Sequence, residues 1–148
     1  MREEFNEYLR AIYVSEVVSE RISQIIDRVN LIIQEEVRRI FVINYFNQAQ
    51  EVVNGPIWFI SERFLVYFPD ITNLQSFIVF KSLGMIVSAN IDIKNFDFEN
   101  ANSNSELRIR LTKTDGEFHE FKAIRKNCEY LWQIYQDLLS RYYIDLNT

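Results

Sequence analysis

The chain has 148 residues, 48% of them hydrophobic and 25% charged, which is the balance of a globular protein and excludes extensive disorder. The formal net charge is −5, so the basic excess expected of a nucleic-acid binder or of a polybasic membrane patch is missing. Cys128 is the sole cysteine and no signal-peptide pattern opens the sequence, so we expect a cytoplasmic protein without a disulfide bond.

The first 50 residues predict a coiled-coil-like helical arm, because every glycine and proline of the chain lies after residue 54. A heptad repeat of apolar residues runs through residues 5–43 and fails at Ser15, Ser19 and Glu36. The arm is therefore either one long helix or a helical hairpin, with Ser15–Ser19 or Asn30 as the bend.

Further apolar residues lie off the heptad seam, so the arm has more apolar surface than a helix can leave in water. The arm can fold back on itself, pack against the following domain or pair with another chain, and we favour another chain. The seam then supplies a candidate interface for a protein partner or for self-association, formed by Ile22, Ile26, Val29, Ile33 and Ile40.

Residues 51–148 predict a run of antiparallel strands. Short apolar runs occupy 57–61, 64–68, 77–80 and 85–91, and alternating apolar and polar residues follow at 92–98 and 106–113. The stretch between them, 95–105, is rich in asparagine and serine and predicts a mobile connecting loop, with a contact site as the less favoured alternative.

A three-residue loop, Thr114–Gly116, predicts the register of the last hairpin. It keeps charged side chains off the apolar face and places Gly116 where the backbone needs a positive φ. The expected pairs are Leu107 with Ala123, Ile109 with Phe121 and Leu111 with His119. A two-residue loop would instead pair apolar residues with charged ones.

The last element is an amphipathic helix. Apolar residues recur at spacings of three and four between Cys128 and Tyr142, and Asn127 is placed to cap the start. Such a helix after the last strand covers the open face of an antiparallel sheet.

Two segments resemble the GRAM domain of the pleckstrin-homology superfold. Residues 55–68 (GPIWFISERFLVYF) resemble the opening of GRAM domains, and residues 76–86 (SFIVFKSLGMI) are similar to the next segment of myotubularin-type proteins. The phosphatase domain of that family is missing, since no Cys-x5-Arg loop occurs. The resemblance implies, at 51–148, a PH/GRAM-like antiparallel β-sandwich or barrel capped by a C-terminal helix. The helical arm at 1–50 is not part of the GRAM pattern, and with it the expected fold class is α+β.

Catalytic chemistry finds little support in the sequence. His119 and Cys128 are the sole residues of their types and lie on different predicted elements, so they form neither a metal cluster nor a nucleophilic pair. Three scattered glycines cannot cradle a phosphate. We therefore predict a non-enzymatic protein-interaction or scaffolding module, with no cofactor and no nucleic acid as partner.

The alternative function is membrane targeting, in which a GRAM-like domain binds phosphoinositide headgroups and the protein lies at the membrane periphery. Phosphate binding needs several convergent cationic side chains. The candidates are Arg63, Lys81, Arg108 and Arg110. On a net-acidic chain we expect them to be solvated surface residues rather than a headgroup site.

Overall fold

Three helices and seven strands make up the part of the chain that the computed structural model describes, residues 2–43, 55–71 and 79–143. The strands form two antiparallel sheets, one with four strands and one with three, and neither closes into a barrel within these residues. The chain divides into two compact units, Met1–Ser82 and Leu83–Thr148. The α+β class and the C-terminal helix agree with the sequence, whereas the division falls about thirty residues after the predicted one at residue 50.

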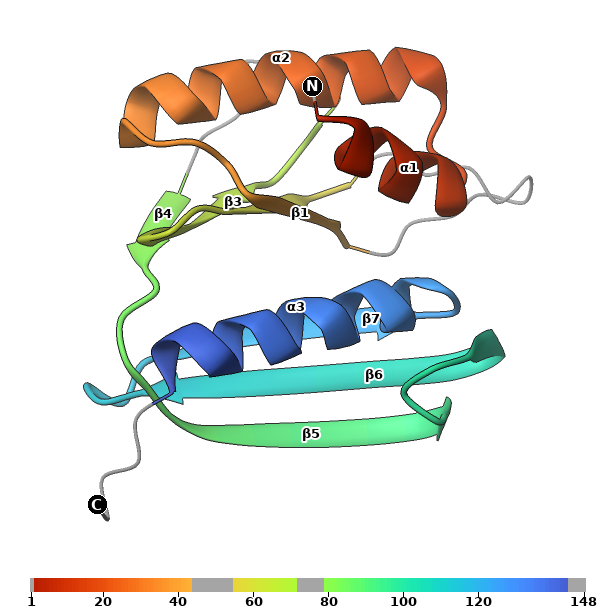
Figure 1. The fold of residues 1–148 in the computed structure, drawn as a ribbon, viewed down its shortest axis with the longest axis vertical. Coiled ribbons are helices and arrows are strands. Elements are labelled where there is room, and N and C mark those ends of the chain that lie inside the picture. The colour runs from red at the N-terminus through yellow and green to blue at the C-terminus, as the bar shows by residue number, and fades with distance from the viewer. Residues whose placement is uncertain (1, 44–54, 72–78, 144–148) are drawn as a thin grey trace. The chain divides into compact units, whose positions relative to one another are not determined.

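Unit 1 has two helices on a four-stranded sheet with the order β1-β2-β3-β4. In Figure 1 both helices lie along one face of this sheet. In chain order its elements are α1 (Glu3–Ala11), α2 (Glu16–Ile33), β1 (Arg39–Val42), β2 (Ile57–Ile60), β3 (Phe64–Phe68) and β4 (Val79–Ser82).

The predicted arm consists of two helices with a break at 12–15 and gives way to a strand after α2, so the prediction of one long helix is wrong; the break adjoins Ser15, one of the predicted bend positions. After α1, the chain re-enters a helix at Ser15, whose hydroxyl accepts a hydrogen bond of 3.3 Å from the N–H of Val18. At the other end of α2, Gln34 takes a left-handed conformation with φ of 57°. That turn directs the chain back toward the sheet.

A strand, not a helix, follows α2. β1 pairs antiparallel with β2, placing Ile40 opposite Phe59 and Val42 opposite Ile57. Ile40 therefore does not belong to a helical seam, and the prediction that extended the seam to it is wrong. Its neighbours Phe41, Val42 and Ile43 are aromatic or β-branched, types that favour a strand once a sheet neighbour buries them.

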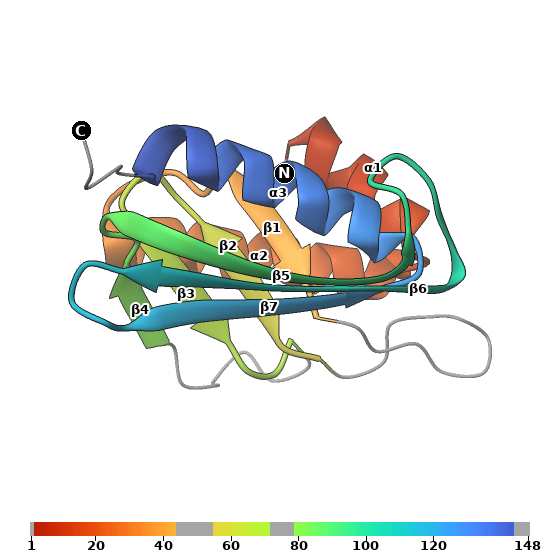
Figure 2. The ribbon, with the colours of Figure 1, turned by 90° about the horizontal axis from the view of Figure 1, so that it is seen from below.

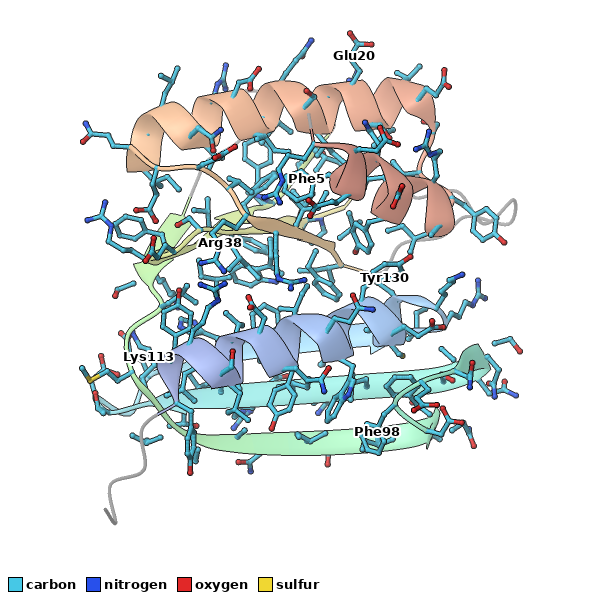
Figure 3. The ribbon with its side chains drawn as sticks, viewed as in Figure 1. Phe5, Glu20, Arg38, Phe98, Lys113 and Tyr130 are labelled. Carbon is cyan, nitrogen blue, oxygen red and sulfur yellow. The ribbon has the colours of Figure 1, made fainter. Side chains whose placement is uncertain are left out.

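Tyr8 ties α1 to the edge of the sheet of unit 1. Its side-chain oxygen accepts a hydrogen bond of 2.9 Å from the backbone N–H of Val42, and both residues are buried. Among the described strands β1 has β2 as its one neighbour, so no second described strand bonds this N–H. Figure 3 shows Phe5 directed from α1 toward the sheet and Glu20 directed away from it.

Unit 2 consists of β5 (Ile86–Phe96), β6 (Ala101–Lys113), β7 (Phe118–Ile124) and α3 (Asn127–Tyr142). The sheet order is β5-β6-β7, and Figures 1 and 2 show α3 running along one face of these strands. The two runs predicted at 85–91 and 92–98 form one strand. The stretch predicted as a loop at 95–105 lies largely within β5 and β6, with a short turn at 97–100.

The register of the last hairpin is confirmed. The three predicted pairs occur, namely Leu107 with Ala123, Ile109 with Phe121 and Leu111 with His119. Gly116 has φ of 86°, in the left-handed region that the three-residue loop requires. Leu107, Ile109 and Leu111 are each 1% exposed, so the face that the loop keeps free of charge is the face that forms the core.

The start of α3 differs from the prediction in one respect. The helix begins at Asn127, and the preceding residue, Lys126, makes no side-chain cap hydrogen bond. Asn127 is therefore not a cap but the first helical residue, and its side chain is buried. The apolar stripe is as expected, since Cys128, Leu131 and Leu138 are at most 1% exposed.

Replacing Tyr8 by Phe tests the link between α1 and the sheet. The substitution leaves the buried N–H of Val42 without its acceptor, so the free energy of unfolding falls by about 1–3 kcal/mol in urea denaturation. The matched control is Tyr13→Phe, because that side chain is 59% exposed and its change leaves stability within about 0.5 kcal/mol. Equal losses from both substitutions would contradict the link.

Candidate functional site

The predicted helical interface is covered within the single chain. Its four members on α2, namely Ile22, Ile26, Val29 and Ile33, are at most 6% exposed, and Ile40 on β1 is 5% exposed. The role that we assigned to a second chain is filled by the protein's own sheet, one of the alternatives that the sequence leaves open. These five side chains are therefore not exposed for contact with a second chain.

Arg63, a candidate phosphate ligand, is held in an ion pair. Its Nε lies 2.7 Å from Oε2 of Glu35, and its backbone N–H donates to Oε1 of the same carboxylate at 2.8 Å. The hydroxyl of Ser61 donates to that Oε1 as well. The guanidinium carbon lies 4.9 Å from the ring centre of Phe64. Glu35 thus offsets the charge of Arg63 and joins the segment after α2 to the β2–β3 turn.

The contacts of Glu35 with Ser61 and Arg63 shift the pKa of its carboxyl group. Partial burial alone would raise the pKa, but the hydrogen bonds from Ser61 and Arg63, with the charge of Arg63, lower it below the ordinary 4.5. The folded state therefore favours the ionised carboxylate. Its stabilising contribution is present above the ordinary pKa and is lost as the pH falls through the lowered folded value.

Arg108 and Arg110 share the exposed face of β6, as predicted, and share a carboxylate there. Arg110 Nη2 lies 2.8 Å from Oε2 of Glu120, while Arg108 Nε and Lys122 Nζ lie 4.0 and 3.9 Å from Oε1. The hydrogen bond from Arg110 is the main cause that lowers the pKa of Glu120. Arg110 also stacks on Phe118, at 4.3 Å from the ring centre.

The four predicted basic residues are divided between the units. Arg63 and Lys81 belong to unit 1, where Lys81 is exposed on β4, and Arg108 and Arg110 belong to unit 2. Only Arg108 and Arg110 are neighbours on one strand face.

Among the described residues, no strand pairs with the outer edge of β5 beyond the bridge at Ile86, and this edge exposes apolar side chains. Ala89, Ile91 and Ile93 stand on the face of the sheet that α3 covers, opposite buried residues of β6. Yet Ile93 is 43% exposed, and Ala89 and Ile91 are only half-buried. The reason is that α3 packs more extensively on β6 and β7 than on β5.

One flank of α3 runs beside this edge from end to end. Near the end of β5, the ring centres of Phe98 and Trp132 lie 4.5 Å apart. At the start of β5, Tyr143 forms a parallel bridge with Ile86. Figure 3 places Phe98 on the β5 side of the helix and Tyr130 on the opposite side. We name the apolar area the β5–α3 surface; it comprises Ala89, Ile91, Ile93, Phe98, Trp132, Tyr135 and Leu139.

Phe98 is held in this surface by a strained turn. Its φ is 76°, a left-handed value that costs a residue with a side chain about 1–2 kcal/mol. The carboxylate of Asp97 accepts hydrogen bonds from the N–H groups of Asn100 and Glu99, at 2.7 and 3.1 Å, and these bonds lower its pKa. The turn thus presents a ring that is 41% exposed, against Trp132.

Tyr135 continues the surface along the helix. Its ring centre lies 4.9 Å from that of Trp132, and burial, with Tyr143 nearby, raises the pKa of its hydroxyl. In the sequence, Trp132, Tyr135 and Leu139 belong to the apolar stripe of the last predicted helix. The available signal for their partial exposure was weak, because the breadth of the apolar stripe on α3 does not show where the sheet beneath it ends.

The sole cysteine and histidine lie in the core of unit 2. Burial raises the pKa of the Cys128 thiol to about 12, so it is protonated at neutral pH. His119 is 4% exposed and stands opposite Leu111. Among the described residues, no group of three or more histidine, cysteine or acidic side chains is placed to hold a metal ion.

No family model matches the chain, and no curated protein or solved structure matches it. In the described part of the chain, every helix is too short or too polar to span a membrane.

Replacing Glu35 by Gln tests the cluster around Arg63. We expect a loss of about 1–2 kcal/mol in the free energy of unfolding at neutral pH, because a charge-assisted pair becomes a neutral one. The deficit shrinks as the pH falls through the lowered pKa of the wild-type carboxylate, which is then protonated too. The matched control, Glu36→Gln, changes an exposed neighbour and leaves stability almost unchanged. A deficit that persists at the acidic end would show that the charge of Glu35 is irrelevant.

Proposed function

We propose that this protein is a non-enzymatic protein-interaction module, and that the edge of β5 binds an extended segment of a partner protein as an added strand. The observation that carries the proposal is the β5–α3 surface, in which a flank of apolar side chains runs beside a strand edge that no strand of the described residues covers. Main-chain hydrogen bonds to the edge supply affinity, and contacts of alternate side chains supply specificity.

The edge has the length and the form that an added strand requires. β5 has 11 residues, which span about 35 Å at the rise of a strand. Each edge strand leaves a row of main-chain N–H and C=O groups for a neighbour. At Ile86 this edge already pairs with extended backbone, since Tyr143 forms its bridge there. This bridge supports an occupant with an extended backbone rather than a helix.

The side chains of the surface define the partner's pattern. In an added strand, alternate residues face the side on which Ile91, Ile93 and Trp132 lie, so these positions of the partner are apolar. The intervening residues face the side of Asn90 and Asp92, which is polar and exposed. The expected ligand is therefore a segment of alternating apolar and polar residues.

The order of elements supports the same class of function. Within residues 51–148, where the resemblance to the pleckstrin-homology superfold lies, six antiparallel strands are followed by a C-terminal helix among the described residues. The phosphoinositide alternative has weaker support, because Arg63 and Arg110 are each bound to a carboxylate at 2.7 and 2.8 Å. Headgroup phosphates would have to compete with those carboxylates.

Ile93→Glu tests the proposed surface. Peptides are selected from a displayed library on the wild-type chain, and their affinities are measured by fluorescence anisotropy. We expect selected peptides to alternate apolar and polar residues and to bind the variant at least about tenfold more weakly, because a charge replaces apolar contact area. Ile93 is 43% exposed, so the variant folds.

The matched control is Val17→Glu, which puts the same charge on an apolar side chain of α2 that is 70% exposed. It leaves peptide affinity unchanged. If the selected peptides bound both variants as tightly as the wild-type chain, or lost affinity equally for both, the assignment of the site to β5 would be wrong.

A further inference from the structure

The outer edge of β5 belongs to a regular ladder only over residues 88–94. These seven residues pair with β6 without a break, and the register shifts on both sides of them. The edge before them is already bridged, at Ile86, by Tyr143. The stretch that can take a regular added strand is therefore 88–94, and Ile91 is its middle residue.

This stretch has the same pattern that its own edge requires of a ligand. Ala89, Ile91 and Ile93 lie on the face of the sheet that α3 covers, and the residues between them are polar and exposed. A strand added to this edge needs apolar side chains on the first face and polar side chains on the second. β5 of a second copy of the chain meets both requirements.

A two-fold axis through Ile91 matches the apolar faces of two such strands. Antiparallel pairing about this axis sets Ile91 opposite Ile91 of the second copy, and Ala89 of each copy opposite Ile93 of the other. Opposite side chains have Cβ atoms about 4.5–5.5 Å apart, so apolar side chains meet along the whole stretch. Ile93, which is 43% exposed, then exchanges water for an apolar neighbour.

The same axis keeps charges apart on the polar face. It sets Asn90 opposite Asp92 of the second copy, where the amide can donate to the carboxylate, and no two charged residues of the stretch stand directly opposite. An axis through Asp92 would instead set two carboxylates opposite each other, which is destabilising. An axis through Ile93 would leave most of the regular stretch unpaired. The charges and the length of the stretch therefore both favour the axis at Ile91.

We propose that the partner of the β5 edge is a second copy of this chain, whose β5 joins two three-stranded sheets into one of six strands. The axis is perpendicular to the sheet, so both copies of α3 lie on the same face. Pairing also covers a strand edge that would otherwise favour aggregation. This inference rests on the proposed function, because it names the partner that the same edge binds.

Sedimentation equilibrium of the full chain over a range of concentrations tests the pairing, and we expect a monomer–dimer equilibrium. Asn90→Asp sets carboxylates of the two copies opposite each other at two places, and it raises the dissociation constant of the dimer about three- to tenfold. Asn90→Lys sets opposite charges there and lowers the constant by a similar factor. Asn90 is exposed, so both variants fold.

The matched controls are Gln24→Asp and Gln24→Lys, which make the same changes of net charge at an exposed position of α2. They leave the dissociation constant of the dimer within about twofold. A dimer that responds alike to the variants of Asn90 and of Gln24 would overturn the proposal. So would a constant that changes in the same direction with both Asn90 variants.

Peptide binding separates this inference from the proposed function. The selected peptides bind the same edge, so we expect them to dissociate the dimer. A chain that stays monomeric up to millimolar concentration, yet binds those peptides more tightly than its Ile93→Glu variant does, overturns the second copy as partner and leaves the proposed function standing. A monomeric chain that binds no peptide at this edge overturns both.

Discussion

Burial of each sheet's apolar face by helices of its own unit is the constraint on which the rest of the structure depends. In unit 1, Ile22 and Val29 of α2 are fully buried, and in unit 2, Cys128 and Leu131 of α3 are at most 1% exposed. Apolar surface left in water costs about 25 cal/mol per Å². The helices therefore take positions that cover most of each sheet, and the uncovered remainder is what a partner can reach.

The position of α3 illustrates how incomplete coverage leaves apolar surface exposed. One helix spans about 10 Å and cannot cover a three-stranded sheet completely. α3 favours β6 and β7, so the apolar side of β5 and the flank of the helix with Trp132 stay accessible. The opposite face of the same sheet carries charge, and a single carboxylate, Glu120, organises three of its cations. The two faces thus have different chemistry although they share three strands.

Local signals made parts of this fold predictable. The positive φ of Gly116 and the alternation of β6 follow from neighbours in sequence, so the last hairpin was predicted residue by residue. β1 was missed because Ile40 fits a heptad repeat as well as it fits a strand. The pairing of β1 with β2 depends on tertiary contacts, which the local sequence does not show. Arg108 and Arg110 were placed on one face correctly, but the carboxylate that they share stands on another strand. The irregularity between Lys94 and Phe96 was not predictable, because the offset of β5 against β6 is set by the pairing of the two strands.

The two tryptophans of the chain fall one to each unit. Trp58 lies on β2 with its ring 4.8 Å from that of Tyr67, whereas Trp132 lies on α3 beside Phe98. Each indole is therefore an intrinsic optical probe of a different half of the protein. Fluorescence emission from a variant that retains Trp58 alone reports the unfolding of unit 1. Emission from a variant that retains Trp132 alone reports the unfolding of unit 2 and any change in polarity at the β5–α3 surface.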